Sequence, residues 1–114
     1  MTFHTTDRWG AVESNPPIER LRELLQSLDI EDDEHPDVAL KHTTEWCLSA
    51  FPSGLLAWEN IEADDNTARH MTAVPREKVL DLWVKLGRGD IAAVDAEPWL
   101  AGYGPSATSA GPGA

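Results

Sequence analysis

Hydrophobic residues recur every three or four positions in two stretches of the chain, which is the spacing of an amphipathic helix. The first stretch, residues 16–28, follows Asn15, a residue type that often caps helices. The second, residues 76–86, precedes Gly87, which favours a helix end. A further short helix is expected to begin after Asp90. The pattern therefore predicts two main helices and a short C-terminal one.

The segment 45–62 alternates side chains on both sides of a Pro-Ser-Gly corner, which is typical of a β-hairpin. A type I turn with Gly54 in the left-handed position makes Phe51 face Leu55 and so fixes every pair behind them. One face then carries the predicted core residues Trp46, Leu48, Ala50, Leu56 and Trp58. The other face carries Glu45, Cys47, Ser49, Phe51, Leu55, Ala57, Glu59 and Ile61.

Strands are also expected before and after this hairpin, in "VALKHT" (38–43) and "ARHMTAV" (68–74). Residues 1–14 show no periodicity, so we expect a loosely ordered arm there. Residues 15–103 are expected to form one domain, and the Gly, Pro, Ala and Ser residues of 104–114 predict a disordered tail.

These elements predict an α+β fold. Its sheet is expected to be small and antiparallel, with three or four strands around the central hairpin. The two main helices are expected to pack mainly on the face that carries Trp46 and Trp58, and the short C-terminal helix completes the domain.

Charge narrows the range of partners. Twenty acidic residues against nine basic ones give a net charge of −11, which repels a phosphate backbone and attracts basic partners. We therefore expect a protein partner and no direct contact with nucleic acid. A single cysteine excludes an intramolecular disulfide, and the chain shows neither a signal-peptide pattern nor an apolar run near the ~18 residues of a membrane span. These features predict a cytoplasmic protein without a membrane role.

A run of carboxylates is the first candidate binding feature. Residues 29–37 hold six acidic side chains, but they lack the ligand spacing of a calcium-binding EF-hand loop. The run could dock on a basic partner, or it could be a solvated linker. The acidic residues assigned to partner binding are Glu31, Asp32, Asp33 and Glu34.

The second candidate feature is the hairpin face that carries Phe51 and Leu55. Only one face of an antiparallel sheet needs to be buried, so this second apolar face requires cover. Another segment of the chain, a partner protein or a second copy of the chain could supply it. We therefore assign Phe51 and Leu55 to partner binding together with the acidic run.

Catalytic and metal chemistry have weaker support. Cys47 is the only thiol, with His42 or His70 as a candidate base and Glu59 as the group that would orient it. However, a carboxylate beside a thiol raises the pKa of the thiol, and a cysteine in mid-strand is usually a small buried hydrophobe. No histidine pair has the spacing of a metal site on one element. We expect no catalytic residue, metal or cofactor.

The leading hypothesis is a non-enzymatic domain that binds a basic protein. In size and charge the chain is similar to bacterial immunity proteins and nuclease inhibitors, whose negative charge complements that of a basic toxin. This similarity lies in composition and assigns no residue. Two alternatives remain open: a small metal-binding protein or enzyme that uses Cys47, Glu59, His42 and His70, and a homo-oligomeric structural domain.

Overall fold

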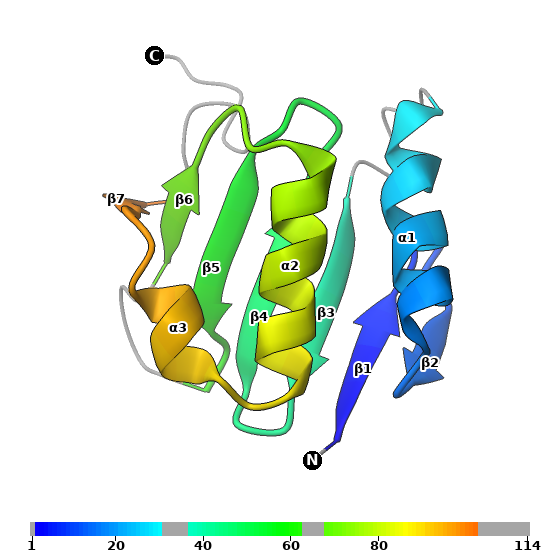
Figure 1. The fold of residues 1–114 in the computed structure, drawn as a ribbon, viewed down its shortest axis with the longest axis horizontal. Helices are drawn as coiled ribbons and strands as arrows, with labels where there is room; N and C mark the ends of the chain where they lie inside the picture. The colour runs from blue at the N-terminus through cyan, green and yellow to red at the C-terminus, as the bar shows by residue number, and fades with distance from the viewer. Residues whose placement is uncertain (1, 31–36, 63–67, 103–114) are drawn as a thin grey trace.

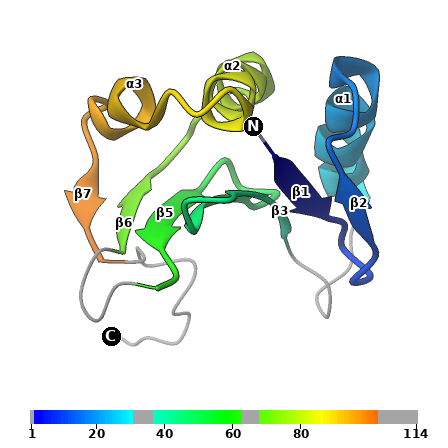
Figure 2. The same ribbon diagram turned by 90° about the horizontal axis from the view of Figure 1, so that it is seen from below.

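The computed structural model describes residues 2–30, 37–62 and 68–102, which form two layers (Figures 1 and 2). One layer is an antiparallel sheet in the order β2-β1-β3-β4-β5-β6-β7. Its strands are β1 (Phe3–Thr6), β2 (Val12–Ser14), β3 (Val38–His42), β4 (Trp46–Ala50), β5 (Leu56–Asn60), β6 (Arg69–Met71) and β7 (Leu100–Ala101). The other layer contains α1 (Ile18–Gln26) with the 3-10 turn η1 (Ser27–Asp29), α2 (Arg76–Gly87) and α3 (Ile91–Asp95).

The prediction of a small sheet with three or four strands is wrong, because the described residues form a sheet of seven strands. Two of the additional strands come from the segment expected to be a loose arm. β1 pairs with β3 from Phe3 opposite His42 to Thr6 opposite Ala39, and β2 pairs with the other side of β1. A strand this short, with the buried polar residue Thr5 at its centre, leaves no alternating hydrophobic pattern to detect.

Asn15 has a different role from the predicted helix cap. Its side-chain oxygen accepts a hydrogen bond from the backbone N–H of Phe3 at 3.0 Å, and its own N–H donates to the Phe3 carbonyl at 2.9 Å. Asn15 therefore closes the β1–β2 hairpin, and α1 begins after Pro17. The other helix predictions agree with the structure within two or three residues, and Asp90 caps α3 by accepting from the N–H of Ala93.

The central hairpin has the predicted register, from Trp46 opposite Asn60 to Ala50 opposite Leu56. Gly54 has φ of +91°, as its place in the turn requires. A Cβ atom would also be crowded there, because it would lie 3.1 Å from the Cα of Ala73.

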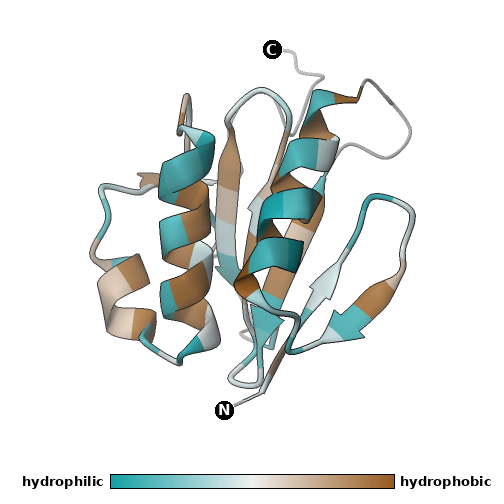
Figure 3. Ribbon diagram, turned by 45° about the vertical axis from the view of Figure 1, so that its right-hand side comes forward, coloured by the Kyte–Doolittle hydropathy of each residue, from teal (hydrophilic) through white to brown (hydrophobic). Residues whose placement is uncertain are grey.

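The helices cover the hairpin face that was predicted to be the core, and both α1 and α2 are amphipathic (Figure 3). Trp58 is fully buried and stacks between Trp46 and Trp99, with ring centroids 4.6 and 6.0 Å away. Trp83 of α2 is also fully buried and donates its indole N–H to the carbonyl of Leu48 at 3.1 Å. These indoles fix the helical layer to the centre of the sheet.

The helices α1 and α2 run antiparallel to each other over the sheet (Figure 1). The end of α1 therefore lies beside the start of α2, and the start of α1 lies beside the end of α2. Each of these two junctions contains a pocket. The opposite face of the sheet is covered by no helix of the described residues (Figure 2).

Candidate partner-binding site

Two described residues that flank the two parts of the predicted binding site, Asp29 and Pro52, lie close together at one end of the molecule. Arg76, the first residue of α2, places one guanidinium nitrogen 3.5 Å from the carboxylate of Asp29 and 3.4 Å from the carbonyl of Pro52. Asp29 ends η1 two residues before the acidic run, and Pro52 follows Phe51 in the β4–β5 turn. The end of α1 and the central turn are thus tied to the same cation.

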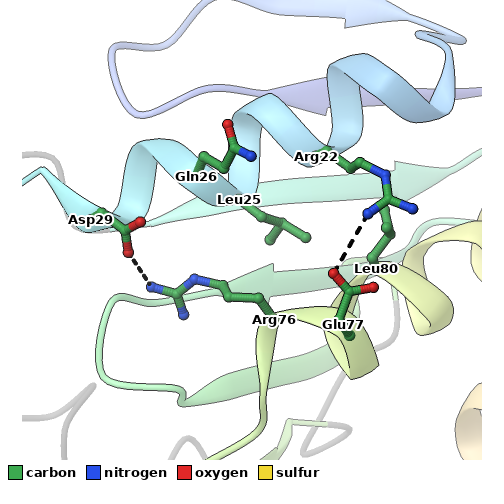
Figure 4. A pocket seen from close by; sticks show the side chains of 7 residues that line it. All are labelled: Arg22, Leu25, Gln26, Asp29, Arg76, Glu77 and Leu80. Carbon is green, nitrogen blue, oxygen red and sulfur yellow. Dashed lines mark hydrogen bonds and ion pairs between the residues drawn. The ribbon is translucent and has the colours of Figure 1, made fainter.

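A small pocket of about 80 Å³ lies between the two helices at this end (Figure 4). Two ion pairs span it, Arg22 with Glu77 and Arg76 with Asp29, each at 3.5 Å. Both carboxylates are largely exposed, so water screens these long pairs and each contributes little to stability. A cation from a partner protein can therefore approach Asp29 or Glu77 at a small cost to the fold.

Large apolar side chains are exposed in the β1–β2 hairpin and directly after η1. Trp9 is 54% exposed, Val12 62% and Ile30 55%. Arg8, which is only 4% exposed, donates from its guanidinium group to the backbone carbonyls of Ser27 and Ile30, and it lies 5.9 Å from the centre of the Trp9 ring. Arg8 therefore fastens the β1–β2 turn to the end of α1 and holds Trp9 close to Ile30.

The first third of the chain also carries most of the negative charge. Residues 1–37 contain ten carboxylates and three arginines, a net charge of −7, whereas the other 77 residues sum to −4. The exposed apolar side chains thus belong to the most acidic part of the sequence. Apolar anchors within a field of one sign are a common composition of protein interfaces.

The predicted binding residues differ in how they are placed. Phe51 is half-buried, whereas Leu55 is only 1% exposed and therefore offers a partner almost no surface, contrary to its predicted role. Glu31, Asp32, Asp33 and Glu34 lie outside the described residues. Their assignment to partner binding stays a prediction.

Sequence reasoning missed Trp9 and Ile30. Neither residue belongs to a periodic pattern, which is the signal that locates helices and strands. A different signal was present, since Ile30 is a lone bulky hydrophobe between Asp29 and the acidic run. The contacts of Arg8 with the Trp9 ring and with the Ile30 carbonyl bring the two residues together in the fold.

The structure separates the residues of the metal or enzyme alternative. Cys47 and Glu59 are directly opposite each other on the sheet face away from the helices, and His70 lies on that face beside Ala57. His42 alternates onto the helix-covered face, where it is buried and its Nδ1 lies 2.9 Å from Thr44 Oγ1. Within residues 2–30, 37–62 and 68–102, no group of three or more His, Cys, Asp or Glu is placed to hold a metal ion.

The chemistry of Cys47 also disfavours nucleophilic catalysis. Burial, with a smaller contribution from the nearby carboxylate of Glu59, raises the pKa of its thiol to about 11. The group therefore remains a neutral thiol near pH 7, whereas the thiolate is the nucleophile.

Comparison with known proteins identifies no relative: the chain matches no protein-family model, no curated protein and no solved structure. Among the described segments, none of the helices combines the length and apolar character needed to cross a bilayer.

Proposed function

We propose that this protein is a small acidic domain of the cytoplasm that binds a basic protein partner. The binding surface is the end of the molecule defined by Trp9, Ile30, Asp29 and Phe51, together with the acidic run at 31–34. The observation that carries this proposal is the fastening of Trp9 to Ile30 by Arg8, which places two exposed apolar anchors at the point where the chain enters four consecutive carboxylates.

The two kinds of residue have different tasks in this proposal. Trp9 and Ile30 supply apolar area that a partner can desolvate, and aromatic anchors of this kind dominate many interfaces. The carboxylates steer a basic partner during its approach and select against acidic ones. This division suits an immunity- or inhibitor-like protein that neutralises a basic toxin.

The test is capture of a binding partner from the native host, followed by affinity measurements with purified components. We expect Glu31→Gln, Asp32→Asn, Asp33→Asn and Glu34→Gln together to weaken binding at least tenfold and to reduce its dependence on salt. The matched control removes the same charge elsewhere, through Glu19→Gln, Glu62→Gln, Asp64→Asn and Asp65→Asn. The control is expected to change affinity by less than about threefold, since it leaves the four carboxylates next to Ile30 in place.

The apolar part of the surface is tested separately with Trp9→Ser and Ile30→Ser. Each is expected to weaken binding, because it removes a desolvated anchor, while leaving the salt dependence unchanged. If the control substitutions weaken binding as much as the substitutions in the acidic run, the binding surface is not localised at this run. Retained binding in every variant would contradict the proposal itself.

Self-association is the alternative with a specific observation in its favour. β2 is an edge strand, its Val12 is exposed, and a second copy could pair with that edge. Sedimentation at high protein concentration separates the two cases. A stable dimer that Val12→Lys dissociates would favour the homo-oligomer over binding of a basic partner.

A further inference from the structure

An apolar pocket of about 230 Å³ lies at the other junction of α1 and α2, where α1 begins and α2 ends. Its walls come from three elements and one loop: β1, α1, α2 and the residues before α1. It is lined by Phe3, Pro16, Ile18, Leu21, Trp83, Val84, Gly87 and Arg88. Arg88 is the only charged residue in this lining, so the pocket combines apolar walls with a single cation.

Arg88 differs from the other cations of the described residues. Seven of them form ion pairs with carboxylates: Arg20, Arg22, Lys41, Arg69, Arg76, Lys78 and Lys85. Arg8 is bound to two backbone carbonyls. Arg88 is exposed and has no ion pair within the described segments. In so acidic a protein, this leaves one guanidinium group able to receive an anion from outside.

The start of α1 adds a second feature that favours an anion at the same pocket. No side chain caps this helix, and its first intrahelical hydrogen bonds are donated by the N–H groups of Arg20 and Leu21. The N–H groups of Ile18 and Glu19 precede them at the positive end of the helix dipole. Ile18 also lines the pocket, so this partial positive charge lies at its rim. The negative end of α2 is at the same pocket, but its last carbonyls already accept hydrogen bonds from the N–H groups of residues 88–90.

We propose that this pocket binds a small apolar carboxylic acid. An aromatic or branched alkyl group would occupy the space between Phe3, Val84 and Ile18, above the buried Trp83, and the carboxylate would pair with Arg88. A volume of about 230 Å³ suits one such group, because pockets for drug-sized ligands start near ~300 Å³.

The surroundings favour a free acid over the end of a peptide. Peptides that bind in extended form usually gain affinity by adding a strand to an exposed sheet edge. The strand beside this pocket, β1, is paired with β2 on one side and with β3 on the other. The main chain of a peptide would therefore find no strand edge here.

The test uses the full chain and 3-phenylpropionate as the probe, with binding followed by NMR through the indole N–H signal of Trp83. We expect a dissociation constant of about 0.1–10 mM, given the few atoms of the ligand and the net negative charge of the protein. The uncharged 3-phenylpropan-1-ol should bind at least fivefold more weakly, and 3-phenylpropylamine more weakly still. Equal affinity for acid and alcohol would overturn the role of Arg88.

Two variants locate the site. Arg88→Gln is expected to reduce the affinity for the acid to that for the alcohol, whereas the matched control Lys85→Gln, one turn away and outside the lining, should alter neither by more than twofold. Val84→Phe should fill the pocket and abolish binding of both, with an unchanged Trp58 signal as the check that it folds. Acid binding that survives in Arg88→Gln and Val84→Phe would overturn the proposal.

A final measurement distinguishes a free carboxylic acid from the C-terminal carboxylate of a peptide. Acetyl-glycyl-phenylalanine carries the same aromatic group and carboxylate at the end of a peptide. If it binds more tightly than 3-phenylpropionate, the assignment to a free acid is wrong. These outcomes leave the proposed protein partner untouched, since its surface lies at the opposite junction of the two helices.

Discussion

The two hairpins of this protein are built in contrasting ways. The central one, β4–β5, lies in the middle of the sheet, and its Leu48 and Trp58 are fully buried beneath the helices. The outer one, β1–β2, forms an edge and exposes Trp9 and Val12. The contrast teaches that similar local geometry can supply either stability or a surface for recognition, depending on what covers it.

The forces that hold the hairpins also differ. The central hairpin is held by apolar burial and by the stacked indoles around Trp58. The outer hairpin is held mainly by polar ties: Arg8 to the end of α1, Glu13 to Arg20 at 2.6 Å, and Asn15 to Phe3. Substitutions in the two hairpins should therefore have unequal effects on the free energy of unfolding.

The largest expected effect is that of Trp58→Ala. Removing a fully buried indole leaves a cavity and breaks two stacking contacts, so we expect a loss of about 3–5 kcal/mol in unfolding free energy. Trp9→Ala, the matched change in the outer hairpin, should cost about 0.5 kcal/mol or less. Urea unfolding measures both. Similar losses for the two would show that the contrast in burial has no energetic meaning.

Arg8→Ala should have the next largest effect, about 2–3 kcal/mol. It removes charge-assisted hydrogen bonds to two carbonyls from a buried position. Unlike Trp58→Ala, it should also increase hydrogen exchange in β2 and at the end of α1 before the rest of the sheet. Arg8→Lys is the control, and it should restore only part of the stability because one ammonium group cannot reproduce the guanidinium geometry. Uniform exchange throughout the sheet would contradict a local fastening.

Cys47 provides a pH test of the central hairpin. The folded thiol has a pKa of about 11 against 9.0 for an ordinary thiol, so the folded state holds this proton more tightly. The resulting stability is present below pH 9 and is lost as the pH rises from 9 to 11, by about 2 kcal/mol. Comparison of urea unfolding at pH 8.5 and 10.5 with that of Cys47→Ala isolates the effect. If the free energy of unfolding depends on pH in the same way in both proteins, Cys47 is not the group responsible.

The smallest expected effect on stability distinguishes the β1–β2 turn from the β4–β5 turn. Gly10 and Gly54 have nearly the same φ, +90° and +91°, but only Gly54 is crowded, because a Cβ atom added to it would lie 3.1 Å from the backbone of Ala73. Gly10→Ala should cost about 1 kcal/mol through the backbone alone. Gly54→Ala should cost about 1 kcal/mol more, because the neighbouring chain must shift. Equal losses in thermal or urea unfolding would show that the crowding is relieved without cost.

Prediction from sequence succeeded where a pattern is repeated and strong. The helices and the register of the central hairpin were predictable, because leucine spacing and the turn around Gly54 each constrain several residues at once. The size of the sheet was not, because β1, β2 and β7 are two to four residues long. For the candidate site, composition and register suggested the acidic run and Phe51, and their role in binding stays a prediction, whereas the contacts of Arg76 with Asp29 and Pro52 required the fold.

The sequence by itself determined the acidic character of this protein, its two amphipathic helices and the face of the central hairpin that became the core, because these follow from local spacing and side-chain type. Tertiary structure alone decided that residues 3–14 enter the sheet, that Arg8 joins Trp9 to Ile30, and that Arg88 stands unpaired beside an apolar pocket within the described segments. Such pairs join residues distant in sequence, and only packing brings them within reach of each other.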